Sequence, residues 1–240
     1  MRDYKKEYEE RVAFIRDLLE KSSAKGIVYG NSGGKDSALV GILCKAACDN
    51  TVGIIMPCAS KRNFGQDAED ARIAADQYGI ETRFIDLTPV REAEMQQLSS
   101  LTEVTPAAAV NIAPRLRMTT LYAVAASEGR LVAGTGNRSE AYVGYFTKWG
   151  DGAHDFNPIS DLTVTEIYEF LRYLDAPACI IEKAPSARGL RRQMVGERQQ
   201  FYMLSPSVRF AASCLRKILL NLTVPRTVRP FQGSHYSTPR

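Results

Sequence analysis

The chain has 240 residues, of which 45% are hydrophobic and 24% charged, and its formal net charge is +4. This length and balance suit one globular domain that buries a full core. The charged N-terminus argues against a signal peptide, and no apolar run approaches the roughly 18 residues that a membrane span needs. The five cysteines show no metal-binding spacing, so we expect reduced thiols in a cytoplasmic protein.

Strands and helices are predicted to alternate along most of the chain. Apolar side chains recur at helical spacing among charges near the N-terminus, and short apolar runs bounded by Gly or Pro follow. In chain order we expect a helix at 5–22, a strand at 26–30, a helix at 37–48, strands at 51–57 and 81–87 around a helix at 66–78, a helix at 115–128, a strand at 130–135 and a helix at 163–175. This alternation predicts an α/β fold, a parallel sheet with helices on both faces.

Two segments are predicted to be loops. Residues 99–114 are rich in small residues and Pro, and residues 144–160 are rich in Gly, Asp and aromatic residues. Long loops of this kind tend to carry function, and either could cover a site. The helix that follows the second loop is expected to be capped by Asp161 or Thr163.

Residues 30–37 read GNSGGKDS and follow the first predicted strand. The kinase-type phosphate loop requires Gly, four residues, and then Gly-Lys-Ser/Thr. Tyr29 stands where the first glycine should be, and Asp36 stands where the hydroxyl should be. The stretch therefore serves a different phosphate chemistry.

The glycines of this stretch would let the backbone approach an anion, and the following helix would supply free N–H groups. Ser32 and Ser37 add hydroxyl donors. Asp36 would repel a phosphate unless a divalent cation lies between them, which predicts a metal-bridged nucleotide. The alternative is a glycine turn in which Asp36 only caps the helix.

The string Ser-Gly-Gly-x-Asp-Ser resembles the pyrophosphate loop of the ATP pyrophosphatase superfamily, which cleaves ATP to AMP and pyrophosphate. The segments PRLRM (114–118), GTGNRSEAYVGYFTKWGDGAHDFNPI (134–159) and KAPSA (183–187) resemble the ammonia-dependent NAD synthetase family. The resemblance covers about residues 5–187. It implies a Rossmann-like fold of the adenine nucleotide alpha hydrolase type.

The resemblance implies a ligase that amidates deamido-NAD to NAD with ammonia and ATP. The reaction would pass through an acyl adenylate, use Mg²⁺, and take place in a homodimer. No glutamine-hydrolysing domain is expected, so the nitrogen donor would be free ammonia or ammonia made by a separate protein. The open alternatives are another ATP pyrophosphatase, such as a tRNA-modifying enzyme, and a catalytically impaired ATP-binding homologue.

The family's functional positions fall on residues of this chain that have suitable chemistry. Asp36 and Glu140 would bind Mg²⁺, Lys35 would stabilise the departing pyrophosphate, and Asp151 would take a proton from ammonia. Each of two roles has an alternative: Glu140 could be a solvent-exposed residue, and Asp151 could only shape its loop. ATP would be bound by Gly30, Asn31, Ser32, Gly33, Gly34, Lys35, Asp36, Ser37, Thr135 and Ser186, and deamido-NAD by Arg115, Lys148 and Asp155.

The resemblance ends near residue 187. Residues 186–240 hold ten of the 31 Lys and Arg residues but one of the 27 acidic residues, so the charge changes from about −5 to about +9. We therefore divide the chain into a synthetase domain at 1–187 and an atypical basic segment at 188–240. The hypotheses for this segment are, in order, an altered reading frame, a divergent or disordered tail, and a nucleic-acid-binding extension, the last being the least favoured. Val164 also departs from the family, which often has a Lys that contacts ATP there.

Overall fold

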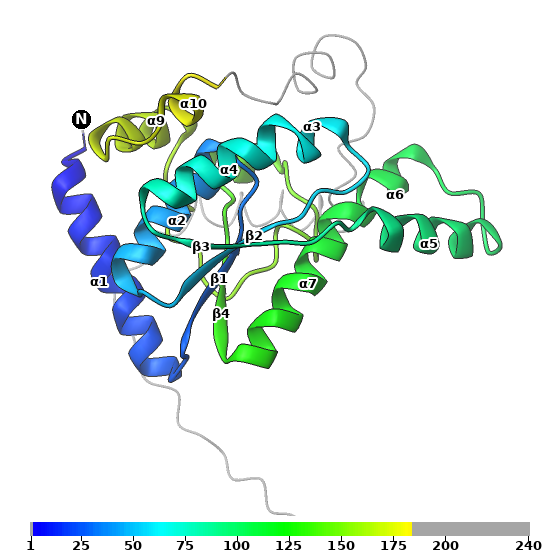
Figure 1. Cartoon of the computed structure of the whole chain (residues 1–240), viewed down its shortest axis with the longest axis horizontal. Helices are drawn as coiled ribbons and strands as arrows, with labels where there is room; N and C mark the ends of the chain where they lie inside the picture. The colour runs from blue at the N-terminus through cyan, green and yellow to red at the C-terminus, as the bar shows by residue number, and fades with distance from the viewer. Residues whose placement is uncertain (1, 184–240) are drawn as a thin grey trace, which may run out of the picture. The chain divides into compact units, whose positions relative to one another are not determined.

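Four short parallel strands form the sheet at the centre of the structure (Figure 1). The computed structural model describes residues 2–183, without the side chains of residues 61 and 62. Ser186, the predicted boundary at 187 and the segment 188–240 lie outside the described residues. The strand order is β3-β2-β1-β4, with β1 at Gly26–Gly30, β2 at Thr51–Ile55, β3 at Glu81–Phe84 and β4 at Arg130–Ala133. The predicted parallel sheet is confirmed.

Helices cover both faces of the sheet, as predicted. Alternate residues of a strand point to opposite faces, so Ile27 and Tyr29 join one core and Val28 the other. The first core also takes side chains from α1 (Tyr4–Ser22), α2 (Lys35–Ala47), α4 (Gln66–Gln77), α9 (Val164–Tyr173) and α10 (Ala178–Ile181). The second core packs the sheet against α7 (Ile112–Glu128).

The expectation of a loop over 99–114 is wrong for most of that segment. It contains α6 (Pro106–Val110) and the start of α7. Thr105 caps α6 by accepting from the Ala108 backbone N–H, and Pro106 occupies the first turn, where its missing N–H costs nothing. A Thr-Pro pair before a run of alanines is a helix-start signal, and it outweighs the small residues that favour a loop.

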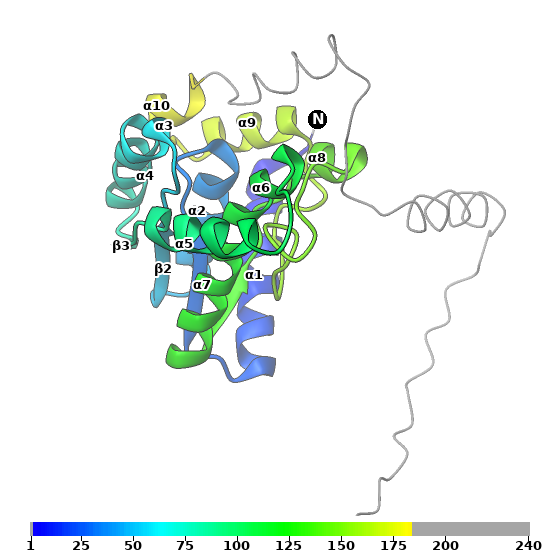
Figure 2. The ribbon, with the colours of Figure 1, turned by 90° about the vertical axis from the view of Figure 1, so that its right-hand side faces the viewer.

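Four more helices had no predicted counterpart: α3 (Lys61–Phe64), α5 (Thr88–Ser99), α8 (Arg138–Val143) and α10. None of the residues of α5 is buried, so the helix lacks the apolar stripe on which periodicity depends. Figure 1 shows α5 and α6 projecting from one side of the sheet, and Figure 2 looks onto that side.

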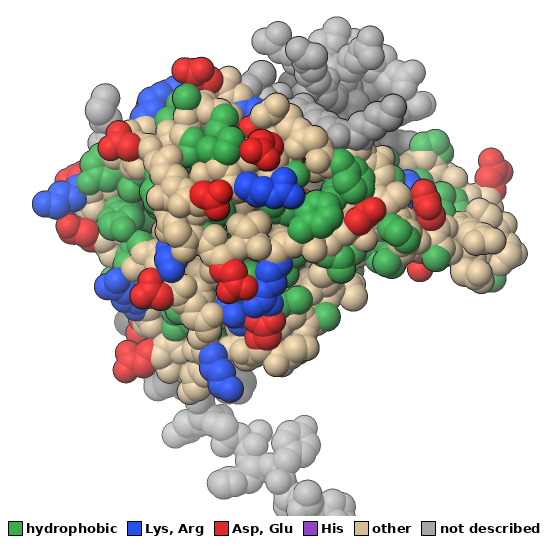
Figure 3. Space-filling view, in the orientation of Figure 1, with side chains coloured by type: hydrophobic (Ala, Val, Ile, Leu, Met, Phe, Trp, Pro, Cys, Tyr) green, Lys and Arg blue, Asp and Glu red, His purple; other side chains and the backbone are tan. Residues whose placement is uncertain are grey.

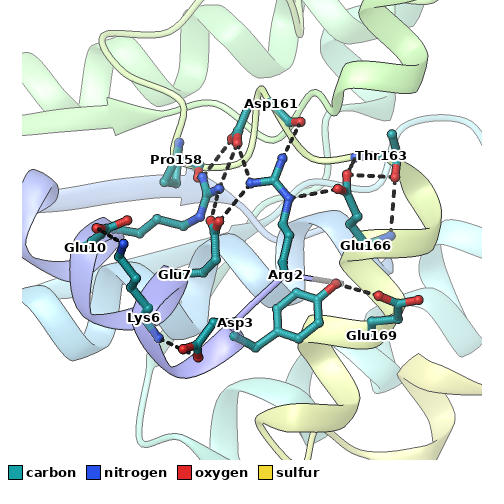
Figure 4. Close-up of polar contacts among 12 residues, drawn as sticks. Arg2, Asp3, Lys6, Glu7, Glu10, Pro158, Asp161, Thr163, Glu166 and Glu169 are labelled. Carbon is teal, nitrogen blue, oxygen red and sulfur yellow. Dashed lines mark hydrogen bonds and ion pairs between the residues drawn. The ribbon is translucent and has the colours of Figure 1, made fainter.

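A network of ion pairs fixes α1 to the segment before α9 (Figure 4). Arg2 contacts Glu166 at 2.8 Å and Asp161 at 3.1 Å, and Arg11 contacts Asp161 at 2.8 Å. Thr163 caps α9 in a reciprocal pair with Glu166, while Asp161 binds the two arginines. Thr163 is therefore the cap, and Asp161 anchors the N-terminal helix.

Charged side chains of both signs are interspersed on the face drawn in Figure 3. The ion pairs of the described residues also bring the two signs together, and Arg83 lies within ion-pair distance of both Glu81 and Glu128. This arrangement differs from a single-sign basic stripe of the kind that tracks a phosphate backbone. Within residues 2–183, no helix has both the length and the apolar character needed to cross a membrane.

Candidate active site

A cavity of about 550 Å³ opens at the carboxyl ends of β1, β2 and β4. In open α/β sheets, ligands bind at this edge. The stretch GNSGGKDS, here called the phosphate loop (residues 30–37), contributes seven of its eight residues to the lining, and Gly33 is the exception. A cavity therefore lies where the sequence predicts the nucleotide site.

The phosphate loop joins the last residue of β1 to the first turn of α2. Gly34 stands at the N-cap of α2, and it has no side chain that could accept from the N–H groups of the first turn. The Ser32 and Ser37 hydroxyls lie 3.1 Å apart, and the Ser37 hydroxyl donates to the Gly34 carbonyl at 3.0 Å. The loop is thus held by its own hydroxyls, while the helix N–H groups are left for an anion.

Gly33 must be glycine for two reasons. Its φ is +67°, in the left-handed region, and a Cβ there would lie 2.0 Å from the Asp67 carbonyl oxygen. The Asn31 side-chain amide donates to the Ala71 carbonyl of α4 at 3.0 Å. The phosphate loop therefore rests directly on the backbone of α4.

Asp36 and Glu140 come together, as predicted from the neighbouring strand ends. Asp36 accepts from Lys35 Nζ at 2.6 Å and from Asn137 Nδ2 at 3.0 Å. Asn137 caps α8, and Glu140 reaches back to its backbone N–H at 3.1 Å. Burial, and then the nearby Asp36 carboxylate, raise the pKa of Glu140 to about 7. The two carboxylates repel each other, and a divalent cation between them would relieve that repulsion.

The donor set fits Mg²⁺. Both side chains supply hard oxygen ligands, and no described residues form a cluster of three or more metal-binding side chains. Mg²⁺ typically takes one or two carboxylates and completes its shell with water and substrate phosphates. Asp36 and Glu140 beside an anion-binding loop match that pattern.

Thr135 and Asp151 also line the cavity. Asp151 accepts from the Thr147 backbone N–H at 2.8 Å, so it shapes its loop. Asp151 therefore shapes its loop, as the alternative interpretation expects, and it also lines the cavity. One carboxylate oxygen can hold the turn while the other faces a ligand.

Arg115, Lys148 and Asp155 do not line the cavity. The Arg115 guanidinium donates to the Lys148 carbonyl at 3.4 Å. Asp155 accepts from Tyr122 Oη at 3.1 Å and from the Val132 N–H at 2.8 Å. Arg115 and Tyr122 are seven residues apart on α7 and so share one helix face. The three predicted substrate contacts therefore belong to the surface formed by α7 and the 144–160 loop.

Sequence reasoning missed several residues that line the cavity, among them Asp67, Arg117 and Lys183. Arg117 donates from Nε to the Met56 carbonyl at 3.0 Å, and burial lowers its pKa. It pairs with no carboxylate of residues 2–183, whereas Lys35 and Lys183 both do. Arg117 and Lys183 belong to the segments PRLRM and KAPSA, which were the available signal. Val164 lies outside the lining.

Comparison with known proteins gives a consistent result. The NAD synthase family model matches residues 7–201. The NH(3)-dependent NAD(+) synthetase of Carboxydothermus hydrogenoformans is 46% identical over 188 residues, which cover 77% of this chain and 76% of that protein. That of Archaeoglobus fulgidus is 42% identical, with 78% and 74% covered.

Two solved structures extend the comparison. NMN synthetase from Francisella tularensis is 36% identical with a TM-score of 0.73, and 78% of this chain and 77% of that chain are covered. The NH3-dependent NAD synthetase from Campylobacter jejuni, in complex with nitrate, is 31% identical with a TM-score of 0.70. There the match covers 95% of this chain and all of the other.

Proposed function

The chain belongs to the NAD synthase family, and we propose that it is an ammonia-dependent NAD synthetase, a carbon–nitrogen ligase. Its substrates are deamido-NAD, ATP and ammonia, and its products are NAD, AMP and pyrophosphate. The observation that carries the proposal is the position of Asp36. A carboxylate beside an anion-binding helix N-terminus, with Glu140 nearby, suits a metal-bound pyrophosphate and not the transfer of a γ-phosphate.

In the first step the nicotinate carboxylate oxygen attacks the α-phosphorus of ATP. The bond to the bridging oxygen breaks, and pyrophosphate leaves with that electron pair. The N–H groups of the phosphate loop, together with the Ser32 hydroxyl, would hold the β- and γ-phosphates, and Ser37 would keep the loop in shape through its bond to the Gly34 carbonyl. Lys35 would stabilise the charge that develops on the leaving group. Mg²⁺ held by Asp36 and Glu140 would supply further charge neutralisation there.

In the second step ammonia attacks the carbonyl carbon of the acyl adenylate. The carbon–oxygen bond to AMP breaks, AMP leaves with the electron pair, and the nitrogen loses one proton. Asp151 lines the cavity and would accept that proton. The 144–160 loop would keep water from the adenylate, because hydrolysis there would waste ATP.

Deamido-NAD would extend from the cavity to the surface of α7 and the 144–160 loop. Arg115 and Lys148 present cations to its phosphates, and Asp155 lies on the same surface. Tyr142 and Trp149 are 84% and 66% exposed on α8 and the 144–160 loop. We infer a homodimer in which a second copy covers these side chains, and sedimentation of the full chain measures it.

The test combines the full chain with ATP, Mg²⁺, deamido-NAD and ammonium. We expect NAD, AMP and pyrophosphate in equal amounts, and no NAD when ammonium is omitted. Parallel reactions replace deamido-NAD with nicotinate mononucleotide or with tRNA. ATP binding without AMP formation would identify an impaired homologue, and AMP formed only with tRNA would overturn the proposal.

The mononucleotide is included because the Francisella protein is described as an NMN synthetase. The chemistry of amidation is the same for the two acceptors. Faster turnover with the mononucleotide would place this chain with that protein, and the roles of Asp36 and Glu140 would be unchanged.

A further inference from the structure

Lys183 joins three parts of the structure at the edge of the phosphate loop. Its ammonium lies 2.8 Å from the Gly33 carbonyl oxygen, 2.6 Å from Asp70 Oδ2 and 2.8 Å from Asp67 Oδ1. Its side chain is 15% exposed, and Asp70 is 2% exposed. The three donors of an ammonium are therefore all used, in a setting where little water competes.

The backbone supports this placement. Lys183 follows α10, which packs against α2, α4 and α9. The Tyr168 hydroxyl of α9 donates to the Lys183 carbonyl at 3.3 Å. A packed segment therefore positions the ammonium, although Lys183 is 150 residues from Gly33 in the sequence.

The contact with Gly33 determines the direction of an N–H group in the phosphate loop. A trans peptide is planar, and its carbonyl and the following N–H point in opposite directions. When Lys183 holds the Gly33 carbonyl, the Gly34 N–H is turned the other way. Gly34 lines the cavity and Gly33 does not. The orientation of this peptide therefore decides whether the loop presents a donor to a phosphate.

We propose that Lys183 is a positioning residue that fixes the Gly33–Gly34 peptide for pyrophosphate binding. The inference rests on the proposed function, because it takes the phosphate loop as the pyrophosphate site. Lys183 also offsets one of the two α4 carboxylates, which would otherwise both act on an anion in the cavity. Lys183, Asp67 and Asp70 together carry a net charge of −1.

The test separates positioning from charge. Lys183→Met leaves two carboxylates, one of them buried without its cation, so this variant risks poor folding. The double variant K183M/D70N keeps the net charge at −1 and removes the more deeply buried carboxylate, so that only Asp67, whose side chain is 15% exposed, loses its lysine. Lys45→Met is the matched control, because Lys45 lies near the other end of α2 and pairs with Asp49 at 3.2 Å.

Binding of magnesium pyrophosphate and of AMP is measured by calorimetry for all four proteins. We expect K183M/D70N to bind pyrophosphate about tenfold more weakly, the effect of one charged hydrogen bond, with AMP affinity within about twofold. Lys45→Met should match the wild type. Wild-type pyrophosphate affinity in K183M/D70N would overturn positioning, because only the charge would then matter. A wild-type protein that makes no NAD and binds no pyrophosphate would overturn the proposed function as well.

Discussion

Replacing Asp36 by asparagine is expected to stop pyrophosphate release while the fold stays intact. The substitution keeps the shape of the side chain but turns one oxygen into an NH₂ group and removes the charge. Asp36 Oδ2 is 2.6 Å from Lys35 Nζ, and Oδ1 is 3.0 Å from Asn137 Nδ2, so the new NH₂ faces a donor in either orientation. The side chain is 18% exposed.

The effects on stability and on activity differ in size. Loss of a partly exposed pair costs about 1 kcal/mol, which lowers Tm by about 2–4 °C in a chain of this length. Loss of one preorganised charge at the reacting phosphates costs about 10²–10³-fold in turnover, or roughly 3–4 kcal/mol. The activity loss should therefore far exceed what unfolding could cause.

Pyrophosphate release is followed with saturating ATP, deamido-NAD and ammonium, and Tm is measured on the same samples. Asp49→Asn is the matched control, because Asp49 follows α2 at its other end and is fully exposed. We expect it to retain wild-type turnover. Turnover of Asp36→Asn at the wild-type rate would refute the assignment of Asp36 to the pyrophosphate site.

Three further predictions concern backbone, substrate binding and pH. Gly33→Ala should lower the urea-measured free energy of unfolding by several kcal/mol because its Cβ meets the Asp67 carbonyl. Gly79→Ala, at φ +62° in open space, should cost only about 1 kcal/mol, and equal losses would contradict the clash. Arg117 lines the cavity and pairs with no carboxylate of residues 2–183, so we expect it to contact the substrate carboxylate. Arg117→Met should therefore raise KM for deamido-NAD about tenfold with little change in Tm, and an unchanged KM would contradict that contact. The Thr163 backbone N–H, and then Arg2, lower the pKa of Glu166 from 4.5 to about 2. The contribution of Glu166 to stability is therefore complete above pH of about 4.5, and it is lost as the pH falls toward about 2. Urea unfolding across that range should show a shallower decline for Glu166→Gln, and an identical decline would contradict this account.

The layered fold was predictable because each buried strand left a local signal. Residues 26–30 and 51–55 are short apolar runs bounded by turn residues, and the structure places them side by side in the sheet. Helices α5 and α8 bury no residue, so they left no apolar period to detect. The capping box of Asn137 and Glu140 supports α8, whereas α5 has no side-chain cap and packs against α7.

The phosphate loop was predictable because its eight residues are contiguous and their chemistry is local. Lys183 was not, although KAPSA was one of the segments that carried the resemblance. Its partners lie on α4 and in the phosphate loop, and only the packing of α10 brings them within 3 Å. The resemblance of KAPSA pointed to the segment, but nothing in the sequence connects Lys183 with Asp67, Asp70 or Gly33.

Charge compensation is the reason we expect Arg117 to take part in the chemistry. The attacking carboxylate and the α-phosphate are both anionic, so their approach requires a cation near both. Lys35 is engaged by Asp36, and Lys183 by the carboxylates of α4. Arg117 contacts a backbone carbonyl, and burial lowers its pKa. It lines the same cavity as Asp151, the group that would later deprotonate ammonia. Amidation removes the substrate's negative charge, so the same guanidinium would bind the product less tightly than the substrate.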